Sequence, residues 1–206
     1  MNRHSHPGYL ILALSLMALV VAGCGKPPEA ETQAAQAAMN DAKAAEAATY
    51  AGSDLDAAED TLAAAQAEVE KQNSKFALFR NYKEATRMMA VAQGLAQNAQ
   101  QVAGVEKEKA RIEAEALYTQ LSAAVDSTRA LMEKAPRDKE GKKIMEMITT
   151  DLDGAAATMP EIRAMIDKGD YRGALQSARA SMQKVESLRS EIQGAIDKKA
   201  SMRSGT

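Results

Sequence analysis

The chain has 206 residues, a net charge of −2 at neutral pH, one cysteine and no tryptophan, so no basic excess directs it to nucleic acid. Its two histidines are His4 and His6, so beyond Cys24 the chain offers neither imidazole nor thiol. This excludes Ser-His and Cys-His nucleophilic pairs and ordinary zinc or copper sites from the rest of the chain, and we expect no enzyme activity and no cofactor.

The first element in the chain is an apolar N-terminal segment. Arg3 supplies a positive start, residues 9–22 form an apolar core, and the small residue Gly23 precedes Cys24. The apolar run is shorter than the about 20 residues that a membrane-spanning helix needs. The pattern predicts a signal peptide over residues 1–23, cleaved between Gly23 and Cys24. The alternative is an uncleaved signal anchor in which Cys24 is an incidental thiol.

The run Val21-Ala22-Gly23-Cys24 resembles the lipobox of bacterial lipoproteins. The resemblance implies that Cys24 carries acyl chains such as palmitate, and two or more such chains hold a protein stably on a membrane. In enteric-type sorting an aspartate after the cysteine retains the protein at the inner membrane, so Gly25 implies delivery to the outer membrane, facing the periplasm. Residues 24–28 are then a lipidated tether, and the membrane is the first expected partner.

The rest of the chain carries a helical pattern. Alanine is its commonest residue, and alanine and straight-chain residues lose little entropy in a helix. Apolar residues recur at alternating steps of three and four, which is typical of bundle or coiled-coil seams. We expect an all-α fold, an elongated antiparallel helical bundle of five helices. Their expected ranges are 29–48, 54–79, 82–134, 139–168 and 171–198.

Helix-breaking residues set several of these boundaries. Pro136 ends the third helix, because proline disfavours helix in the residue before it. Pro160 predicts a kink inside the fourth helix, and Gly169 ends that helix. Residues 200–206 are expected to form a disordered tail.

The third helix is expected to join two three-helix units. Its apolar seam is interrupted by the charged stretch Glu106-Lys107-Glu108-Lys109 and then resumes one step shifted. This divides the chain into units at 29–104 and 105–199 that share a long central helix, whose continuity the sequence leaves open.

The two units have similar sequence marks. Asp54-Leu55-Asp56 in the first resembles Asp151-Leu152-Asp153 in the second, and Asn81-Tyr82 resembles Asp170-Tyr171. These matches indicate a degenerate repeat. The alternative is that any two alanine-rich helical seams align this well.

The first unit also resembles a known family. The run Ala48-x-Tyr50-Ala51 is followed by Leu55-x-x-Ala58-x-x-x-Leu62-x-x-Ala65 and then by Tyr82-x-x-Ala85-x-x-x-Met89-x-x-Ala92. Over residues 29–104 this pattern resembles the alanine-rich envelope domain catalogued as domain of unknown function 4398. The resemblance implies a helical lipoprotein and brings no catalytic residues.

Three functions are weighed for such a chain. The first is a non-enzymatic envelope lipoprotein, a helical spacer or adaptor for an unknown protein partner or for further copies of itself. The second is a module that binds peptidoglycan or another glycan, for which few aromatic rings are present. The third is a hydrolase that uses paired carboxylates, such as Asp54/Asp56 or Asp151/Asp153. A spacing of two places such pairs on different helix faces, where capping is the simpler explanation.

One local segment is a candidate contact site for a partner. Residues 71–87 contain both phenylalanines of the chain, Phe76 and Phe79, together with Arg80, Lys83 and further basic residues. The segment is therefore apolar and basic in a chain that is acidic overall, and it could contact an acidic partner or a lipid headgroup surface. The alternative is that the two phenylalanines continue the apolar seam of the second helix, with the basic residues solvated around it.

Overall fold

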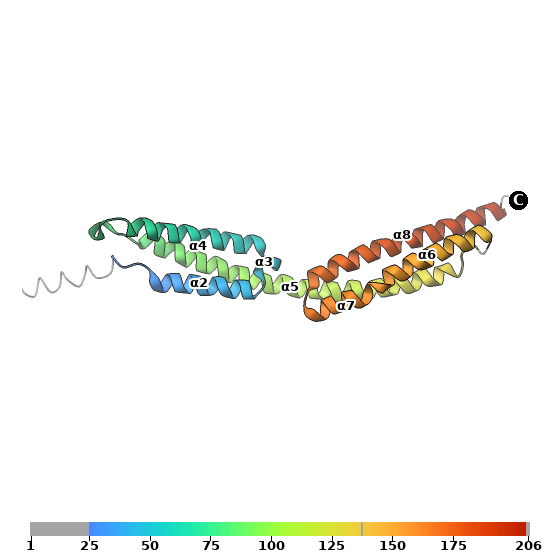
Figure 1. Cartoon of the computed structure of the whole chain (residues 1–206), viewed down its shortest axis with the longest axis horizontal. Helices are drawn as coiled ribbons and strands as arrows, with labels where there is room; N and C mark the ends of the chain where they lie inside the picture. The colour runs from blue at the N-terminus through green and yellow to red at the C-terminus, as the bar shows by residue number, and fades with distance from the viewer. Residues whose placement is uncertain (1–24, 137, 205–206) are drawn as a thin grey trace, which may run out of the picture. The chain divides into compact units, whose positions relative to one another are not determined.

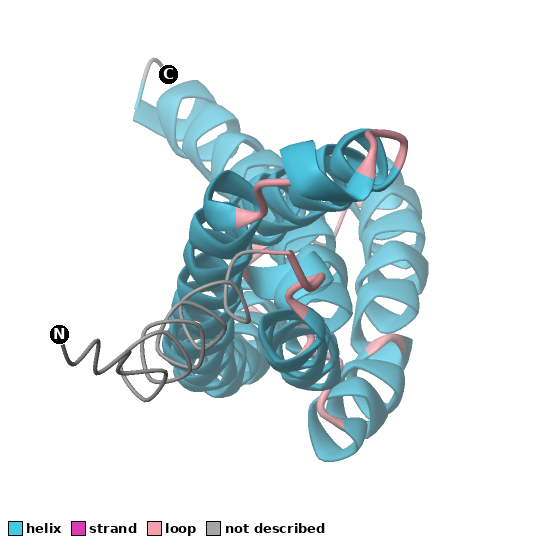
Figure 2. Cartoon of the chain, turned by 90° about the vertical axis from the view of Figure 1, so that its left-hand side faces the viewer, coloured by secondary structure: helices cyan, strands magenta, loops and turns pink. Residues whose placement is uncertain are grey.

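The computed structural model describes residues 25–136 and 138–204, and in these ranges the chain forms helices joined by short loops, with no strand (Figure 2). The predicted all-α helical fold is confirmed. The chain divides into two compact units, one ending at Glu106 and the other beginning at Lys107. Within the described ranges no helix combines the length and the apolar character needed to cross a membrane.

Unit 1 is built from α2 (Glu29–Ala44), α3 (Ala47–Tyr50), α4 (Gly52–Asn73) and the first part of α5 (Lys83–Met132) (Figure 1). Helix α4 packs against both α2 and α3. A loop that contains a short 3₁₀ helix, η2 (Ala77–Phe79), joins α4 to α5.

Helices α2 and α4 run antiparallel. Near the end of α2, Lys43 pairs with Glu59 in the first half of α4 at 2.7 Å. At the start of α2, Pro28 lines a surface recess together with Val69, which lies near the end of α4. The N-terminal tether and the loop after α4 therefore lie at the same end of unit 1 (Figure 1).

The core of unit 1 follows the apolar spacing read from the sequence. The residues at these spacings are buried, and most are alanine, which lets the helix backbones approach closely. They are Ala35, Ala38, Met39 and Ala42 from α2, Leu55, Ala58, Leu62 and Ala65 from α4, and Ala85, Met89, Ala92 and Ala96 from α5.

Unit 2 is built from the rest of α5 with α6 (Lys139–Ala157), α7 (Met159–Lys168) and α8 (Tyr171–Ser204). Helix α8 packs along both α6 and α7 (Figure 1). The fully buried large side chains of this unit are Leu121, Leu152, Ile162, Val185 and Ile192, one or more from each helix. Helix α5 is continuous from Lys83 to Met132, which answers the question that the charged stretch had left open.

Two helices of unit 1 end earlier than predicted. The first was expected to reach residue 48, but α2 ends at Ala44, and Glu46 adopts a left-handed conformation with φ 61°. The turn at Glu46 redirects the chain so that Ala47 and Tyr50 of the short helix α3 become buried. The second helix was expected to reach residue 79, but α4 ends at Asn73 because side-chain hydrogen bonds stabilise a loop there.

Two predictions for unit 2 are also corrected. The expected kink at Pro160 is a full break at Thr158, after which Pro160 occupies the first turn of α7, where a missing N–H is not needed. The expected disordered tail from residue 200 is helical as far as Ser204, since α8 continues beyond the expected end at 198. The final two residues lie outside the described ranges.

Candidate functional site

The predicted lipid-attachment residue Cys24 and the cleavage residue Gly23 lie outside the described residues. The described residues begin at Gly25, directly after Cys24. Pro28 is buried, and its carbonyl accepts hydrogen bonds from the Thr32 N–H at 3.0 Å and the Thr32 hydroxyl at 2.7 Å. Pro28 is thus the N-cap of α2, and this helix begins only a few residues after Cys24.

The predicted contact residues lie in the loop after α4. We call residues 74–82 the tip loop. Three large apolar side chains of this loop are exposed, Phe76 at 70%, Leu78 at 80% and Phe79 at 74%. The two phenylalanine rings have centroids 6.4 Å apart. The alternative prediction, that these rings continue the apolar seam of α4, is wrong. Leu78 was not singled out from the sequence, although it lies between the two phenylalanines and outside the seam spacing.

A buried amide shapes the tip loop. Gln72 is only 5% exposed, and its side-chain oxygen accepts hydrogen bonds from the Asn81 N–H at 3.1 Å and the Lys75 ammonium at 2.9 Å. The Tyr82 hydroxyl is bonded to the Asn73 side-chain oxygen at 2.5 Å. These bonds join the end of α4 to the start of α5. They offer the chain hydrogen bonds that compete with the continuation of α4.

The Arg80 side chain bonds the backbone of the same loop. Its guanidinium donates to the backbone carbonyls of Asn73 and Lys75, each at 3.0 Å. The Phe79 N–H donates to the Phe76 carbonyl at 2.9 Å within η2. Because the backbone is held by these bonds, the exposed apolar side chains are presented on a structured loop.

The charge around the tip loop is positive. Two nearby carboxylates are bonded to side chains of their own helices. Hydrogen bonds from Gln72, and to a smaller extent from Lys71, lower the pKa of Glu68, and a hydrogen bond from Arg87 lowers the pKa of Glu84. Within the described part of the chain, no carboxylate lies at ion-pair distance from the three basic side chains of the loop and its border, Lys75, Arg80 and Lys83.

The paired acids considered for a hydrolase do not converge on one point. Asp151 pairs with Lys184 of α8 at 2.9 Å, whereas Asp153 pairs with Arg129 of α5 at 3.0 Å. The two carboxylates therefore link α6 to different neighbouring helices.

In the first copy, one carboxylate of the pair also contacts a neighbouring helix. Asp54 of α4 accepts a hydrogen bond from Asn98 of α5 at 3.2 Å. Among residues 25–136 and 138–204, no cluster of three or more His, Cys, Asp or Glu side chains could hold a metal ion.

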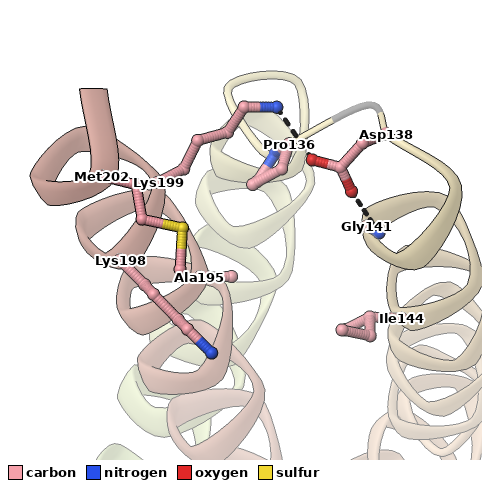
Figure 3. Close-up of a pocket in the computed structure, with 8 residues that line it drawn as sticks. All are labelled: Pro136, Asp138, Gly141, Ile144, Ala195, Lys198, Lys199 and Met202. Atoms are coloured by element: carbon pink, nitrogen blue, oxygen red, sulfur yellow. Dashed lines mark hydrogen bonds and ion pairs between the residues drawn. The ribbon is translucent and has the colours of Figure 1, made fainter. Parts of the chain in front are cut away.

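Unit 2 has a surface pocket of about 170 Å³ between the start of α6 and the end of α8 (Figure 3). Asp138 stands at its rim, where one carboxylate oxygen accepts the Gly141 N–H at 2.8 Å and the other contacts the Lys199 ammonium at 3.0 Å. These two bonds, the first more than the second, lower the pKa of Asp138. Ile144 and Met202 line the pocket with exposed apolar surface, a feature that the sequence reading missed.

No protein-family model, curated protein or solved structure matches the chain. The likeness to the lipobox and to domain of unknown function 4398 therefore stays a prediction from the sequence.

Proposed function

We propose that the chain is a non-enzymatic lipoprotein of the bacterial envelope, anchored through Cys24, that serves as a helical adaptor for a protein partner. The observation that carries the proposal is the apolar surface at one end of unit 2. Ile144 is 46% exposed and Met202 is 62% exposed, and both line the pocket that Figure 3 shows. Met147, which is 64% exposed, follows Ile144 by three residues on α6. Methionine-rich surfaces of this kind suit protein partners, because the flexible side chains adapt to varied shapes.

The glycan-binding alternative has weaker support in the described structure. Sugars are commonly bound against aromatic rings, but Tyr50 and Tyr82 are 5% and 4% exposed. The rings of Phe76 and Phe79 are exposed, but they are tilted by 50° to each other, so the pair offers no flat platform for a sugar. Binding of the purified chain to peptidoglycan sacculi would favour this alternative.

Crosslinking in living cells tests the adaptor proposal. A photoreactive amino acid at Met147 should attach the chain to a distinct envelope protein. The same amino acid at Glu161, an exposed polar position at the start of α7, is the matched control. We expect a discrete crosslinked band at position 147 and not at 161. Equal labelling at both positions would argue against a partner face at the pocket.

A further inference from the structure

We propose that the tip loop contacts the lipid bilayer that holds Cys24. In this contact Phe76, Leu78 and Phe79 enter the interfacial layer of the membrane, and the basic side chains beside them face anionic headgroups. The inference rests on the proposed anchor at Cys24 and adds a second, non-covalent contact with the same membrane.

The first argument is position. Pro28 is buried against unit 1, and Cys24 lies only four residues before it. Because an extended chain spans at most about 3.6 Å per residue, the acylated residue can lie no more than about 14 Å from Pro28. Pro28 shares a recess with Val69, which lies about 6 Å along α4 from Asn73, the last residue before the tip loop. The anchor therefore keeps the membrane at the end of unit 1 that carries the tip loop.

The second argument is the apolar surface. Three large apolar side chains, Phe76, Leu78 and Phe79, are 70–80% exposed within four consecutive residues. Leaving such side chains in water forgoes the free energy of their burial, and a bilayer interface offers that burial without a shaped pocket. Bonds within the loop satisfy part of its backbone, including the Phe79 N–H and the carbonyls of Lys75 and Phe76, which lowers the cost of dehydrating the loop on entry.

The third argument is charge. Lys75, Arg80 and Lys83 flank the apolar side chains and have no carboxylate at ion-pair distance among the described residues. Basic residues next to an apolar insertion are attracted to anionic phospholipids. A bilayer satisfies the apolar and the basic parts of the loop together, and the short tether brings it there. These considerations favour a membrane over a protein as the occupant.

Fluorescence quenching tests the proposal, because the chain has no tryptophan and only one cysteine. The chain from Cys24 to Thr206, which includes both helical units, is made as a Phe79→Trp variant. Cys24 is then coupled to a maleimide phospholipid in vesicles that contain phosphatidylglycerol and brominated lipid. We expect the emission of this tryptophan to move to shorter wavelength and to be quenched roughly twofold or more by the brominated lipid.

The matched control is Thr49→Trp. Thr49 is exposed in the same unit, but it lies on α3, before α4, so the length of α4 separates it from the tip loop by about 30 Å. Its tryptophan should show no such quenching in the same vesicles. If Phe79→Trp lowers the helical circular-dichroism signal, Leu78→Trp, at the most exposed of the three large apolar side chains, replaces it.

A second variant tests the role of charge. Lys83→Glu, in the Phe79→Trp chain, should reduce quenching in phosphatidylglycerol vesicles. Lys143→Glu, at an exposed position of unit 2, should leave it unchanged. Lys75 and Arg80 are kept because their side chains also hold the loop, Lys75 through the Gln72 oxygen and Arg80 through backbone carbonyls.

Two results would overturn the membrane contact. If vesicle-coupled Phe79→Trp is quenched no more than Thr49→Trp, the membrane contact is overturned. A photoreactive amino acid at Leu78 that crosslinks in cells to a protein and not to lipid would overturn it as well. Chemical coupling at Cys24 does not depend on acylation in cells, so a failure of the proposed anchor leaves the result of this test intact.

Discussion

Gln72 illustrates how one buried polar side chain sets the limit of a helix. Its amide nitrogen donates to Glu68 within α4, and its oxygen accepts from Asn81 across the loop. A buried amide without partners would cost about 1–3 kcal/mol, so the chain favours the conformation that satisfies both ends of the amide. Together with the bond between Asn73 and Tyr82, these contacts explain why α4 stops before Phe76 and why the phenylalanines lie outside the core.

The proposed envelope address depends on Cys24. Cys24→Ser should leave an unprocessed and unacylated precursor, since the hydroxyl cannot take the thioether-linked lipid that the lipobox resemblance implies. Metabolic labelling with a fatty-acid analogue measures the outcome. Gly25→Ala is a suitable control, because an added Cβ there meets nothing within 4 Å. Equal labelling of the serine variant and the parent would show that Cys24 is not the lipid-attachment site.

At the scale of elements, local rules explain where most helices begin and end. Asp138 accepts the Gly141 N–H and so caps α6, and Gly169 ends α7 with φ 83°, a conformation that glycine adopts without strain. The break between α6 and α7 is stabilised across the unit. Thr158 bonds the Ala155 carbonyl at 2.7 Å and meets the hydroxyl of Ser181 on α8 at 2.8 Å.

The cap of α6 leads to a pH prediction. The pKa of Asp138 is lower in the folded chain than its ordinary value, so its contribution to stability is present above that ordinary value and is lost as the pH falls through the folded pKa. Asp138→Asn should therefore lower the melting temperature at neutral pH, and the difference from the parent should shrink in acid. Thermal melts followed by circular dichroism measure this. Asp60→Asn, at an exposed position within α4, should show no such trend.

At the scale of the whole molecule, the two units have separate cores. Leu62 is buried within unit 1 and Leu152 within unit 2, and each is surrounded by helices of its own unit. A charge placed at either position would enter one core only. The stability of the chain should thus behave as two partly independent contributions, as expected for cooperative units that open separately.

Hydrogen exchange with mass spectrometry tests this independence. Leu62→Asp should destabilise unit 1 by several kcal/mol, because an unpaired charge becomes buried, and should speed exchange in α2 and α4. Leu152→Asp should have the same effect on α6 and α8. Glu186→Gln, at an exposed position on α8, should be close to neutral. If either leucine variant loosens both units equally, the cores are not independent.

By itself the sequence determined the helical class and the core. Apolar residues such as Leu62, Leu121 and Leu152 recur at helical spacing, and this periodicity alone predicts which face is buried. The sequence also contains the lipobox-like run at Cys24, the candidate segment around Phe76 and Phe79, and the stop at Gly169. These features depend on neighbours in the chain, so they can be read without knowing what packs against what.

Only the tertiary structure decided whether the candidate segment is core or surface. The same residues around Phe76 fit a longer helix or an open loop, and the choice depends on bonds from Gln72 and Asn73 to residues nine positions away. The end of unit 1 on which the tether lies, and the pocket beside Met202, likewise arise from the packing of separate helices. Helical periodicity predicts which face of a helix is buried, but not which segment of the chain packs against that face.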